Sequence, residues 1–272
     1  MRPLRRAATT RPSGSDTLPA DMAGVRLEEL TWLEAQRELT PDRVVVLPLG
    51  AAAKEHGPHL KLGNDAQLAQ YFAARVLEAA DVVMAPIIPY HYYPAFVEYP
   101  GSTTLRLETA RDLVIDICQG LARFGPRRFY VLNTGVSTVR ALAPAVQALA
   151  AGGVLLGYTD LLDALGPIER EVAQQEGGTH ADEIETSMML HIAPESVDMS
   201  RAVKDYDPCG NGPLTRIRGA TGTYSPTGIF GDPTLATAEK GRRVAEALVK
   251  ALLCDIERLR TAPLPLSRPG LP

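Results

Sequence analysis

The sequence predicts an α/β fold of three layers, in which helices cover both faces of a mainly parallel central sheet. Two observations carry this prediction. Short apolar runs of strand length alternate with longer segments whose apolar residues recur at helical spacing, which is the pattern of βαβ units. The 272 residues are 45% hydrophobic and 22% charged, as in ordinary globular proteins, so the chain can bury one sizeable core.

Strands are predicted at the apolar runs 44–49, 82–88, 128–132 and 154–158. The first run is rich in valine and ends at Gly50, which is typical of a strand buried on both faces. Helices are predicted at 65–80, 109–124, 136–151, 181–192 and 237–260. Ligands of open α/β sheets bind beyond the carboxyl ends of the strands. We therefore expect the chemistry of this protein in the segments that follow the four strands.

A single domain is predicted at residues 25–262, between two segments that lack hydrophobic periodicity. Residues 1–24 are expected to form a disordered or extended arm, and residues 263–272 a proline-rich tail. A net charge of -4 with dispersed basic residues predicts no nucleic-acid partner, and no apolar run is long enough to span a membrane. Three scattered cysteines favour a reducing compartment, so we expect a cytoplasmic protein with a small-molecule partner.

The segment after the first strand concentrates side chains that bind metals. Residues 54–65 read KEHGPHLKLGND and contain two of the five histidines. Imidazole nitrogen and carboxylate oxygen are ligands that suit zinc, manganese or iron. Residue types alone leave open a polar surface loop with incidental histidines.

The same segment resembles the signature loop of the creatininase family, in which Glu-x-His or Gln-His precedes Gly-Pro-His-Leu-Pro-Leu-Gly-Thr-Asp. Three further segments are similar to family motifs in the same order: PGSTTL at 100–105, HADEIETS at 180–187 and GDPTLAT at 231–237. Several separated motifs in the right order are a specific signal. The resemblance implies a creatininase-like fold and a metal-dependent amidohydrolase that acts on the carbon-nitrogen bond of a small amide or cyclic amide.

The family uses two adjacent divalent metals bridged by an aspartate, and Asp65 matches that position. The resemblance places His56 and Glu183 as ligands of the second metal, and His180 and Glu185 among the catalytic residues. Glu183 is preferred to Glu185 as the ligand. Residues 180 and 183 of a helix share a face, whereas residue 185 points away from both.

Both remaining ligands of the first metal are missing from this sequence. Lys54 stands where the family has a glutamate, and Gly135 stands where it has a histidine. We therefore expect one zinc or manganese ion per chain rather than two. The Lys54 ammonium is expected to offset the charge of Asp65. In the alternative, Lys54 points to solvent and Glu55 rotates in as a substitute ligand.

The leading hypothesis assigns proton transfer to His180, and stabilisation of the oxyanion to Lys54 or to the hydroxyls of Thr134 and Ser137. The missing ligands keep two alternatives open: a small-molecule binding protein, or an isomerase or lyase in the same pocket. By family analogy a homo-oligomer, a hexamer, is expected, with the apolar residues Met188, Met189, Leu190 and Ile192 at an interface. Further substrate-binding candidates are Glu55, His59, His91, Tyr92, Tyr93, Tyr158 and Tyr224.

Overall fold

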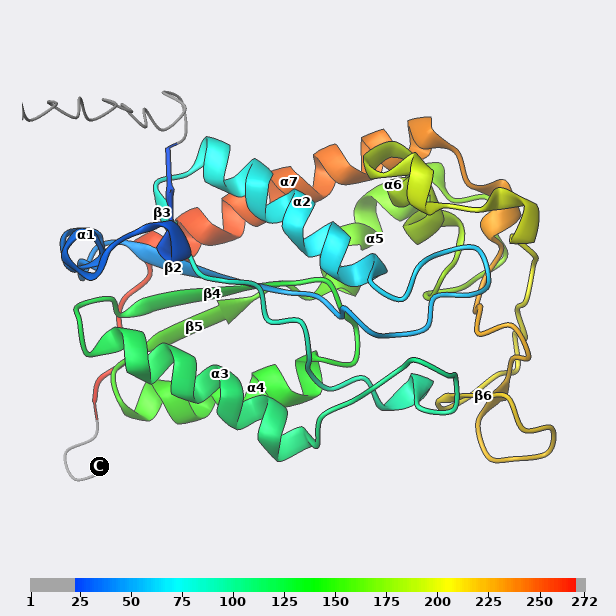
Figure 1. Ribbon diagram of the computed structural model, residues 1–272, viewed down its shortest axis with the longest axis horizontal. Coiled ribbons are helices and arrows are strands. Elements are labelled where there is room, and N and C mark those ends of the chain that lie inside the picture. Colours follow the sequence, from blue (N-terminus) through cyan, green and yellow to red (C-terminus); the bar gives the residue numbers. More distant parts are fainter. Residues whose placement is uncertain (1–22, 268–272) are drawn as a thin grey trace, which may run out of the picture.

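The computed structural model describes residues 23–267. Five parallel strands form its central sheet in the order β1-β3-β2-β4-β5 (Figure 1). Their bounds are β1 (Val25–Arg26), β2 (Val44–Leu49), β3 (Val82–Met84), β4 (Arg128–Asn133) and β5 (Leu155–Tyr158). Almost all of the predicted arm 1–24 and half of the predicted tail 263–272 lie outside the described residues, so the predicted division into arm, domain and tail stays a prediction.

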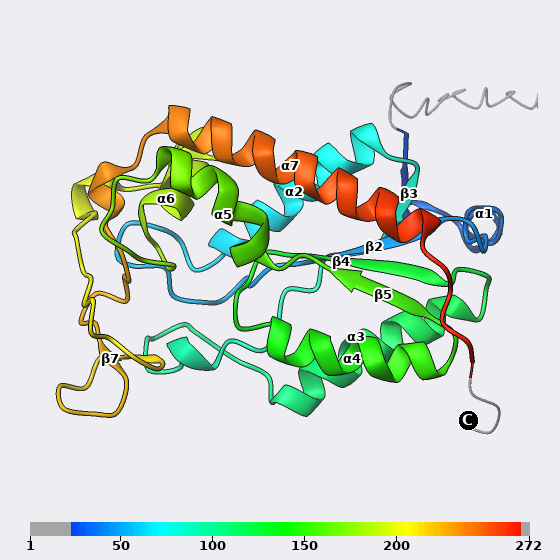
Figure 2. The same cartoon turned by 180° about the vertical axis from the view of Figure 1, so that it is seen from behind.

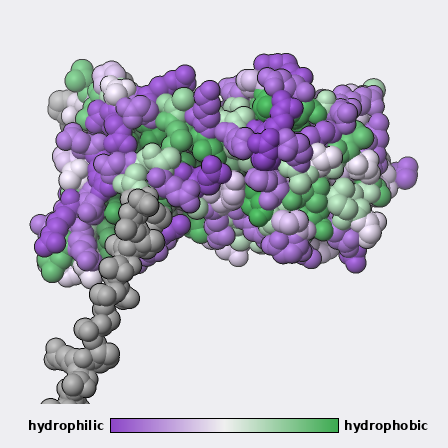
Figure 3. All heavy atoms as spheres, turned by 90° about the horizontal axis from the view of Figure 1, so that it is seen from above, coloured by the Kyte–Doolittle hydropathy of each residue, from purple (hydrophilic) through white to green (hydrophobic). Residues whose placement is uncertain are grey.

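Helices cover both faces of the sheet, which confirms the predicted three-layer α/β/α fold (Figures 1 and 2). One layer holds α2 (Asn64–Ala79), α5 (Leu161–Val172), α6 (Glu183–Ile192) and α7 (Ala238–Thr261). The other layer holds α3 (Leu107–Ala122) and α4 (Val139–Ala151). Seen from above in Figure 3, the outer face of the first layer is mainly hydrophilic with small hydrophobic areas between. Within residues 23–267, no helix combines the length and apolarity that a bilayer span needs.

Strand β2 is buried on both faces, as its valine-rich sequence predicts. Val44 and Val46 pack in the core beneath α2 and α7, while Val45 and Leu47 pack in the core beneath α3 and α4. Because successive side chains of a strand point to opposite faces of the sheet, this one apolar run contributes side chains to both cores. All central strands are parallel, so their carboxyl ends lie at one edge of the sheet.

Several element bounds differ from the sequence predictions for identifiable reasons. β3 ends at Met84, two residues before Pro86, and Ile88 forms only an isolated bridge with Leu49. α4 begins at Val139 because the preceding residues form a loop around the Asn133 side chain. α5 was not predicted, since its interior dipeptide Gly166-Pro167 has the composition of a turn. The short α1 (Trp32–Glu38) and β1 were also missed.

Of the apolar residues expected at an oligomer interface, Met188 and Met189 lie inside the protein, whereas Leu190 and Ile192 are half-buried. Met188 and Met189 are 4% and 1% exposed and belong to the core beneath α7. α6 packs closely on α7, because Gly241 of α7 meets the carbonyl of Ser187. These two methionines therefore hold α6 in place within the chain and are not a free surface.

This close approach generates a stability prediction. A Cβ at Gly241 would lie 1.8 Å from the Ser187 carbonyl oxygen, so Gly241→Ala should lower the free energy of unfolding by roughly 2–4 kcal/mol. Gly120→Ala in α3 is the matched control, because a Cβ there meets no atom within 4 Å. The control should be neutral or stabilising by up to about 1 kcal/mol. Urea titrations of both variants measure the difference, and equal midpoints would contradict the assigned contact.

Candidate metal and catalytic site

Residues 50–63 form the loop that connects β2 to α2, and this loop contains the predicted site residues Lys54 and His56. Gly50 allows the two elements to meet, since a Cβ there would lie 2.2 Å from the Asp65 carbonyl oxygen. The Thr134 hydroxyl, which follows β4, lies 3.0 Å from the carbonyl oxygens of both Leu49 and Asp65. The sheet edge thus fixes Asp65 in the first turn of α2.

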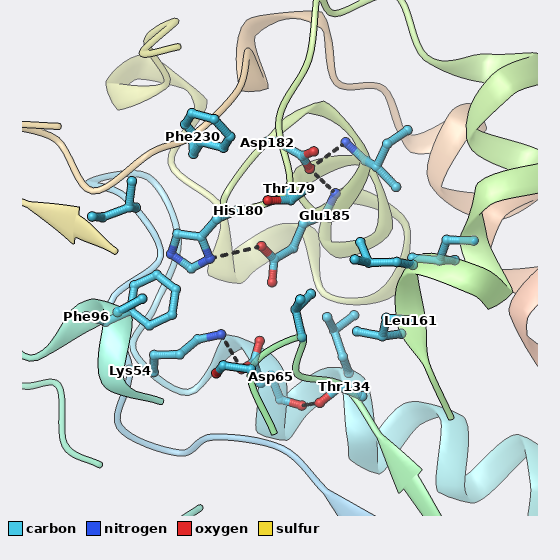
Figure 4. A pocket seen from close by; sticks show the side chains of 18 of the residues that line it. Lys54, Asp65, Phe96, Thr134, Leu161, Thr179, His180, Asp182, Glu185 and Phe230 are labelled. Atoms are coloured by element: carbon cyan, nitrogen blue, oxygen red, sulfur yellow. Dashed lines mark hydrogen bonds and ion pairs between the residues drawn. The ribbon is translucent and has the colours of Figure 1, made fainter. Parts of the chain in front are cut away.

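Lys54 and Asp65 form a buried ion pair at this edge (Figure 4). The Lys54 Nζ lies 2.6 Å from Asp65 Oδ2, and the two side chains are 6% and 0% exposed. The ammonium also lies 4.9 Å from the ring centroid of Phe96 and 5.5 Å from that of Tyr93. Burial would raise the pKa of Asp65, but the Lys54 charge and then His56 outweigh it and hold that pKa well below its usual range. The expected contact between Lys54 and Asp65 is present.

His56 is oriented by the loop and faces two carboxylates. Its Nδ1 lies 2.9 Å from the Lys54 carbonyl oxygen, and its Nε2 lies 2.7 Å from Asp65 Oδ1 and 3.4 Å from Glu185 Oε1. Burial tends to lower the pKa of His56, but the Asp65 carboxylate, helped by Glu185, leaves that pKa raised. The His56 imidazole therefore lies in the part of the site where the carboxylates of Asp65 and Glu185 meet.

His180 belongs to the segment before α6, and its side chain lies in the same part of the site. Its Nε2 lies 3.2 Å from Glu55 Oε2, its Nδ1 lies 3.9 Å from Glu185 Oε2, and its ring packs 4.2 Å from that of Phe96. His56, His180 and Glu185 each offer one ligand atom, and these three atoms lie within 4.8 Å of one another. The geometry brings together two imidazoles and a carboxylate, which is a donor set for a transition metal.

Glu185 is held in this cluster by two contacts. Its Oε1 accepts a hydrogen bond from Asn64 Nδ2 at 2.8 Å, and its Oε2 accepts one from the Ala181 backbone N–H at 2.8 Å. Ala181 has a φ of 49°, in the left-handed region that residues other than glycine seldom adopt. Strain of this kind persists where the surrounding structure requires it, often at functional sites.

The expected ligand Glu183 does not lie in the cluster. Its Oε2 accepts hydrogen bonds from the backbone N–H groups of Gln174 and Gln175, and its Oε1 pairs with Lys240 of α7. The argument for Glu183 assumed that residue 180 is helical, but α6 begins only after Asp182, which caps it. The left-handed Ala181 resets the direction of the chain, so helical spacing does not relate His180 to Glu183. Glu185, and not Glu183, is the carboxylate of this helix that faces His56 and His180.

Glu55, the substitute ligand of the alternative, lies beside His180 and outside the cluster of His56, His180 and Glu185. Its side chain contacts His180, and the Gly57 backbone N–H donates to its Oε1. Its backbone N–H donates to Ser102 Oγ at 2.8 Å, which ties the loop to the segment 100–105. Glu55 therefore orients His180 rather than joining His56.

A cavity of about 400 Å³ opens above the cluster and is lined by Lys54, Asp65, His180 and Glu185. Thr134 and Ser137 line it as predicted. Phe96, Phe230 and Arg140 line it too and were missed, because single aromatic or basic residues outside a motif carry no sequence signal. The remaining substrate-binding candidates do not line this cavity: Glu55, His59, His91, Tyr92, Tyr93, Tyr158 and Tyr224.

Two of these candidates are buried histidines with structural contacts. His59 Nε2 lies 2.8 Å from Thr186 Oγ1, and His91 Nε2 lies 3.1 Å from the Ala110 carbonyl oxygen. Burial lowers the pKa of each imidazole to about 4, so both are neutral at physiological pH. Tyr224 instead lies outside the cavity beneath Arg218, whose guanidinium is 4.6 Å from the ring centroid.

Comparison with known proteins identifies relatives of the whole fold. The family model for creatininase, described as creatinine amidohydrolase, matches residues 28–256. The mycofactocin precursor peptide peptidase of Mycobacterium tuberculosis is 30% identical over 234 residues, which cover 80% of this chain and 86% of that protein. The creatinine amidohydrolase of Pseudomonas putida is 28% identical over 243 residues, covering 82% of this chain and 93% of that protein. The 3-dehydro-scyllo-inosose hydrolase of Thermotoga maritima is 26% identical over 277 residues, covering 89% and 87%.

Solved structures agree with these sequence matches. A crystal structure of creatinine amidohydrolase superposes with a TM-score of 0.74 at 25% identity, covering 88% of this chain and 99% of the other. A manganese form of creatininase gives a TM-score of 0.74 at 25% identity, with 88% and 100% covered. A variant described as a Zn-Zn type gives 0.73 at 26% identity, with 88% and 99% covered.

The separation of Glu183 from the cluster generates a prediction. Glu183→Gln should leave Lys240 without its carboxylate partner and lower the free energy of unfolding by roughly 2–4 kcal/mol, while metal content stays unchanged. Thermal unfolding followed by circular dichroism measures the first effect, and elemental analysis measures the second. Glu171→Gln, which removes an exposed partner of Arg243, is the matched control and should shift stability by less than about 1 kcal/mol. Loss of bound metal from the Glu183 variant would restore Glu183 as the ligand.

Proposed function

Because this chain belongs to the creatininase family, we propose that it is a metal-dependent hydrolase that cleaves a carbon-nitrogen bond of a small amide or cyclic amide. The observation that carries the proposal is the approach of His56 to the carboxylates of Asp65 and Glu185, beside the His180 ring. A divalent ion held by these groups would polarise the substrate carbonyl and activate water for attack.

The donors fit one ion. His56 Nδ1 faces a carbonyl oxygen and can only donate to it, so Nε2 of the neutral imidazole presents its lone pair to two carboxylates. That arrangement is favourable only around a cation, either a proton or a metal ion. His180 is less suited as a ligand because its Nδ1 lies 3.9 Å from Glu185 Oε2, farther than His56 Nε2 lies from either carboxylate. We therefore assign the ion to His56, Asp65 and Glu185. The hydrogen bonds that Asn64 and the Ala181 backbone N–H donate to Glu185 would hold that ligand in position.

Lys54 and His180 are not ligands in this assignment, so they can act on the substrate. The hydroxyls of Thr134 and Ser137 each donate to backbone carbonyls, Ser137 to Tyr92, so their protons are not free for an oxyanion. Lys54 lines the cavity with an ammonium that keeps further donors beyond its contact with Asp65. We assign oxyanion stabilisation to Lys54 and proton transfer to the leaving nitrogen to His180, which Glu55 orients.

The position of the first family metal does not fit an ion. Lys54 already lies against Asp65 Oδ2, where that ion would need the oxygen. Gly135 cannot simply be exchanged for histidine, because a Cβ there would lie 2.9 Å from Thr138 Cγ2 and 3.3 Å from Tyr93 Cε1. Thr138 is fixed by its hydrogen bonds to Asn133 and to the Gly135 carbonyl. Lys54 thus supplies the missing charge, and the Tyr93 ring crowds the position of the missing histidine.

One observation favours a second candidate function, a small-molecule binding protein without catalysis. The charge of Asp65 is balanced by Lys54 and by its contact with His56 before any ion is added. A site that is electrostatically satisfied in this way does not require metal in order to fold. The metal content of the purified protein separates the two candidates.

The first test of the proposal joins metal content to activity. Protein purified without added metal and then exposed to Zn²⁺ or Mn²⁺ should hold close to one ion per chain by elemental analysis. His56→Ala and Glu185→Gln should lose the ion, because each removes a donor. His180→Asn should keep it but lose roughly 10²–10⁴-fold of amide hydrolysis, measured as amine release from a panel of small amides, lactams and short peptides. A metal-free wild type that still binds amides would support the binding protein instead.

The second prediction concerns the first metal position. Lys54→Glu combined with Gly135→His restores both missing ligand types, yet it should still bind one ion because Thr138 Cγ2 and the Tyr93 ring crowd the new histidine. Adding Tyr93→Ala together with Thr138→Ser, which removes Cγ2 and keeps the hydroxyl, should allow a second ion. Elemental analysis and a metal-dependent rise in melting temperature detect it. Tyr92→Ala on the same double variant is the matched control and should not. Two ions in the double variant would show that neither Thr138 nor Tyr93 keeps the second ion out.

A further inference from the structure

One positive charge of the cavity lining has no partner within residues 23–267. Arg140 lines the cavity from the first turn of α4, and its side chain is exposed. No carboxylate of these residues forms an ion pair with its guanidinium, and none of their oxygens accepts a hydrogen bond from it. A guanidinium carries five N–H donors and stays charged at physiological pH. The cavity therefore contains a cation whose donors the described residues do not use.

The stability of α4 does not explain an arginine at this position. The aligned peptide dipoles of a helix place partial positive charge at its first turn, so a cation there is unfavourable. The first turn of α4 contains no acidic residue that would offset the charge of Arg140, and the N-cap residue Thr138 forms no side-chain cap. A bound anion would remove this repulsion, whereas no contact among residues 23–267 does so.

Arg140 lies where the cavity opens to solvent. Among the described residues that line the cavity, it is the one charged residue that is exposed. The other exposed lining residues are uncharged: Val136, Leu162, Thr179, Asn211 and Gly212. The reactive groups Lys54, Asp65 and His180 are buried. A substrate that reaches these groups from solvent must therefore pass a mouth whose charge is positive.

The acidic residues of the cavity do not neutralise this cation. Asp65 pairs with Lys54, and Asp182 accepts hydrogen bonds from the first backbone N–H groups of α6. Burial, and then the charge of Asp182, raises the pKa of Glu169, so that carboxyl holds its negative charge less readily than usual. The charge of Arg140 thus remains available to a ligand.

We propose that Arg140 binds a carboxylate of the substrate, so that the substrate is a small amide with a carboxylate at some distance from the reacting bond. The planar fork of a guanidinium matches the two oxygens of a carboxylate. A phosphate, with its larger charge, is less suited because the carboxylates of Asp65 and Asp182 line the same cavity. The proposal rests on the proposed function, because the amide that is hydrolysed would carry the carboxylate. The cavity volume of about 400 Å³ limits the substrate to a small molecule.

The test compares amides that carry a carboxylate with neutral diamides of equal length. Succinamate, glutaramate and adipamate, and the diamides succinamide, glutaramide and adipamide, are titrated into the zinc-loaded protein by calorimetry. Ammonia release is followed separately. At the best spacer length the carboxylate should bind at least about tenfold more tightly than its diamide at low ionic strength, and this preference should shrink as salt is added. Equal affinities at every length would overturn the assignment.

Variants connect the preference to Arg140. Arg140→Gln should abolish it, and Arg140→Lys, which keeps the charge but not the planar fork, should leave an intermediate preference. Arg123→Gln is the matched control and should keep the full preference, because Arg123 follows α3, is exposed and does not line the cavity. A preference that survives Arg140→Gln would place the carboxylate on the metal or on Lys54 and would overturn the proposal.

The carboxylate site and the hydrolysis can fail separately in these experiments. An Arg140-dependent preference without ammonia release would reject the proposed hydrolysis and keep the carboxylate site. Ammonia release from both kinds of amide, with equal affinities, would reject the carboxylate site and keep the hydrolysis.

Discussion

The buried ion pair between Lys54 and Asp65 is the interaction on which the site depends. An exposed pair of this kind contributes less than about 1 kcal/mol, whereas removing one partner of a buried pair costs roughly 3–5 kcal/mol. The side chain of Lys54 neutralises Asp65, and its carbonyl oxygen accepts from His56 and sets the direction of that imidazole. One residue therefore fixes both the charge of the site and the orientation of its histidine. A glutamate at this position would supply a ligand, but it would leave Asp65 without the positive charge that it now has.

The backbone around the pair is equally constrained. Gly50 lets the start of α2 touch the end of β2, and Thr134 ties the ends of β2 and α2 together through two carbonyl oxygens. At the other side, the left-handed Ala181 turns His180 into the cavity and gives its N–H to Glu185. The two halves of the site are thus built from one glycine contact and one strained alanine, and neither depends on the identity of the substrate.

The sequence predicted most of the fold because valine-rich runs and helical spacing are strong local signals. It also predicted that Lys54 and Asp65 meet beside His56, since all three lie in one short segment, from the loop to the first turn of α2, whose motif is specific. It chose Glu183 over Glu185 because helical spacing was extended through Ala181, whose backbone conformation no local pattern reveals. Part of the cavity lining was not foreseen, because Phe96, Phe230 and Arg140 lie far apart in the sequence and outside any motif. Pairings across more than a hundred residues are set by tertiary packing.

The packing of α6 on α7 has a consequence for the order in which the protein assembles. Lys54, His56 and Asp65 are separated by few residues and can meet once β2 and α2 have formed. Glu185 joins them only after the final helix has docked, because α6 rests on Gly241 and the core of α7. Contacts between distant parts of a chain form late and slowly. A nascent chain that is still being synthesised therefore exposes an incomplete donor set, and metal capture becomes a property of the finished protein rather than a template for its folding.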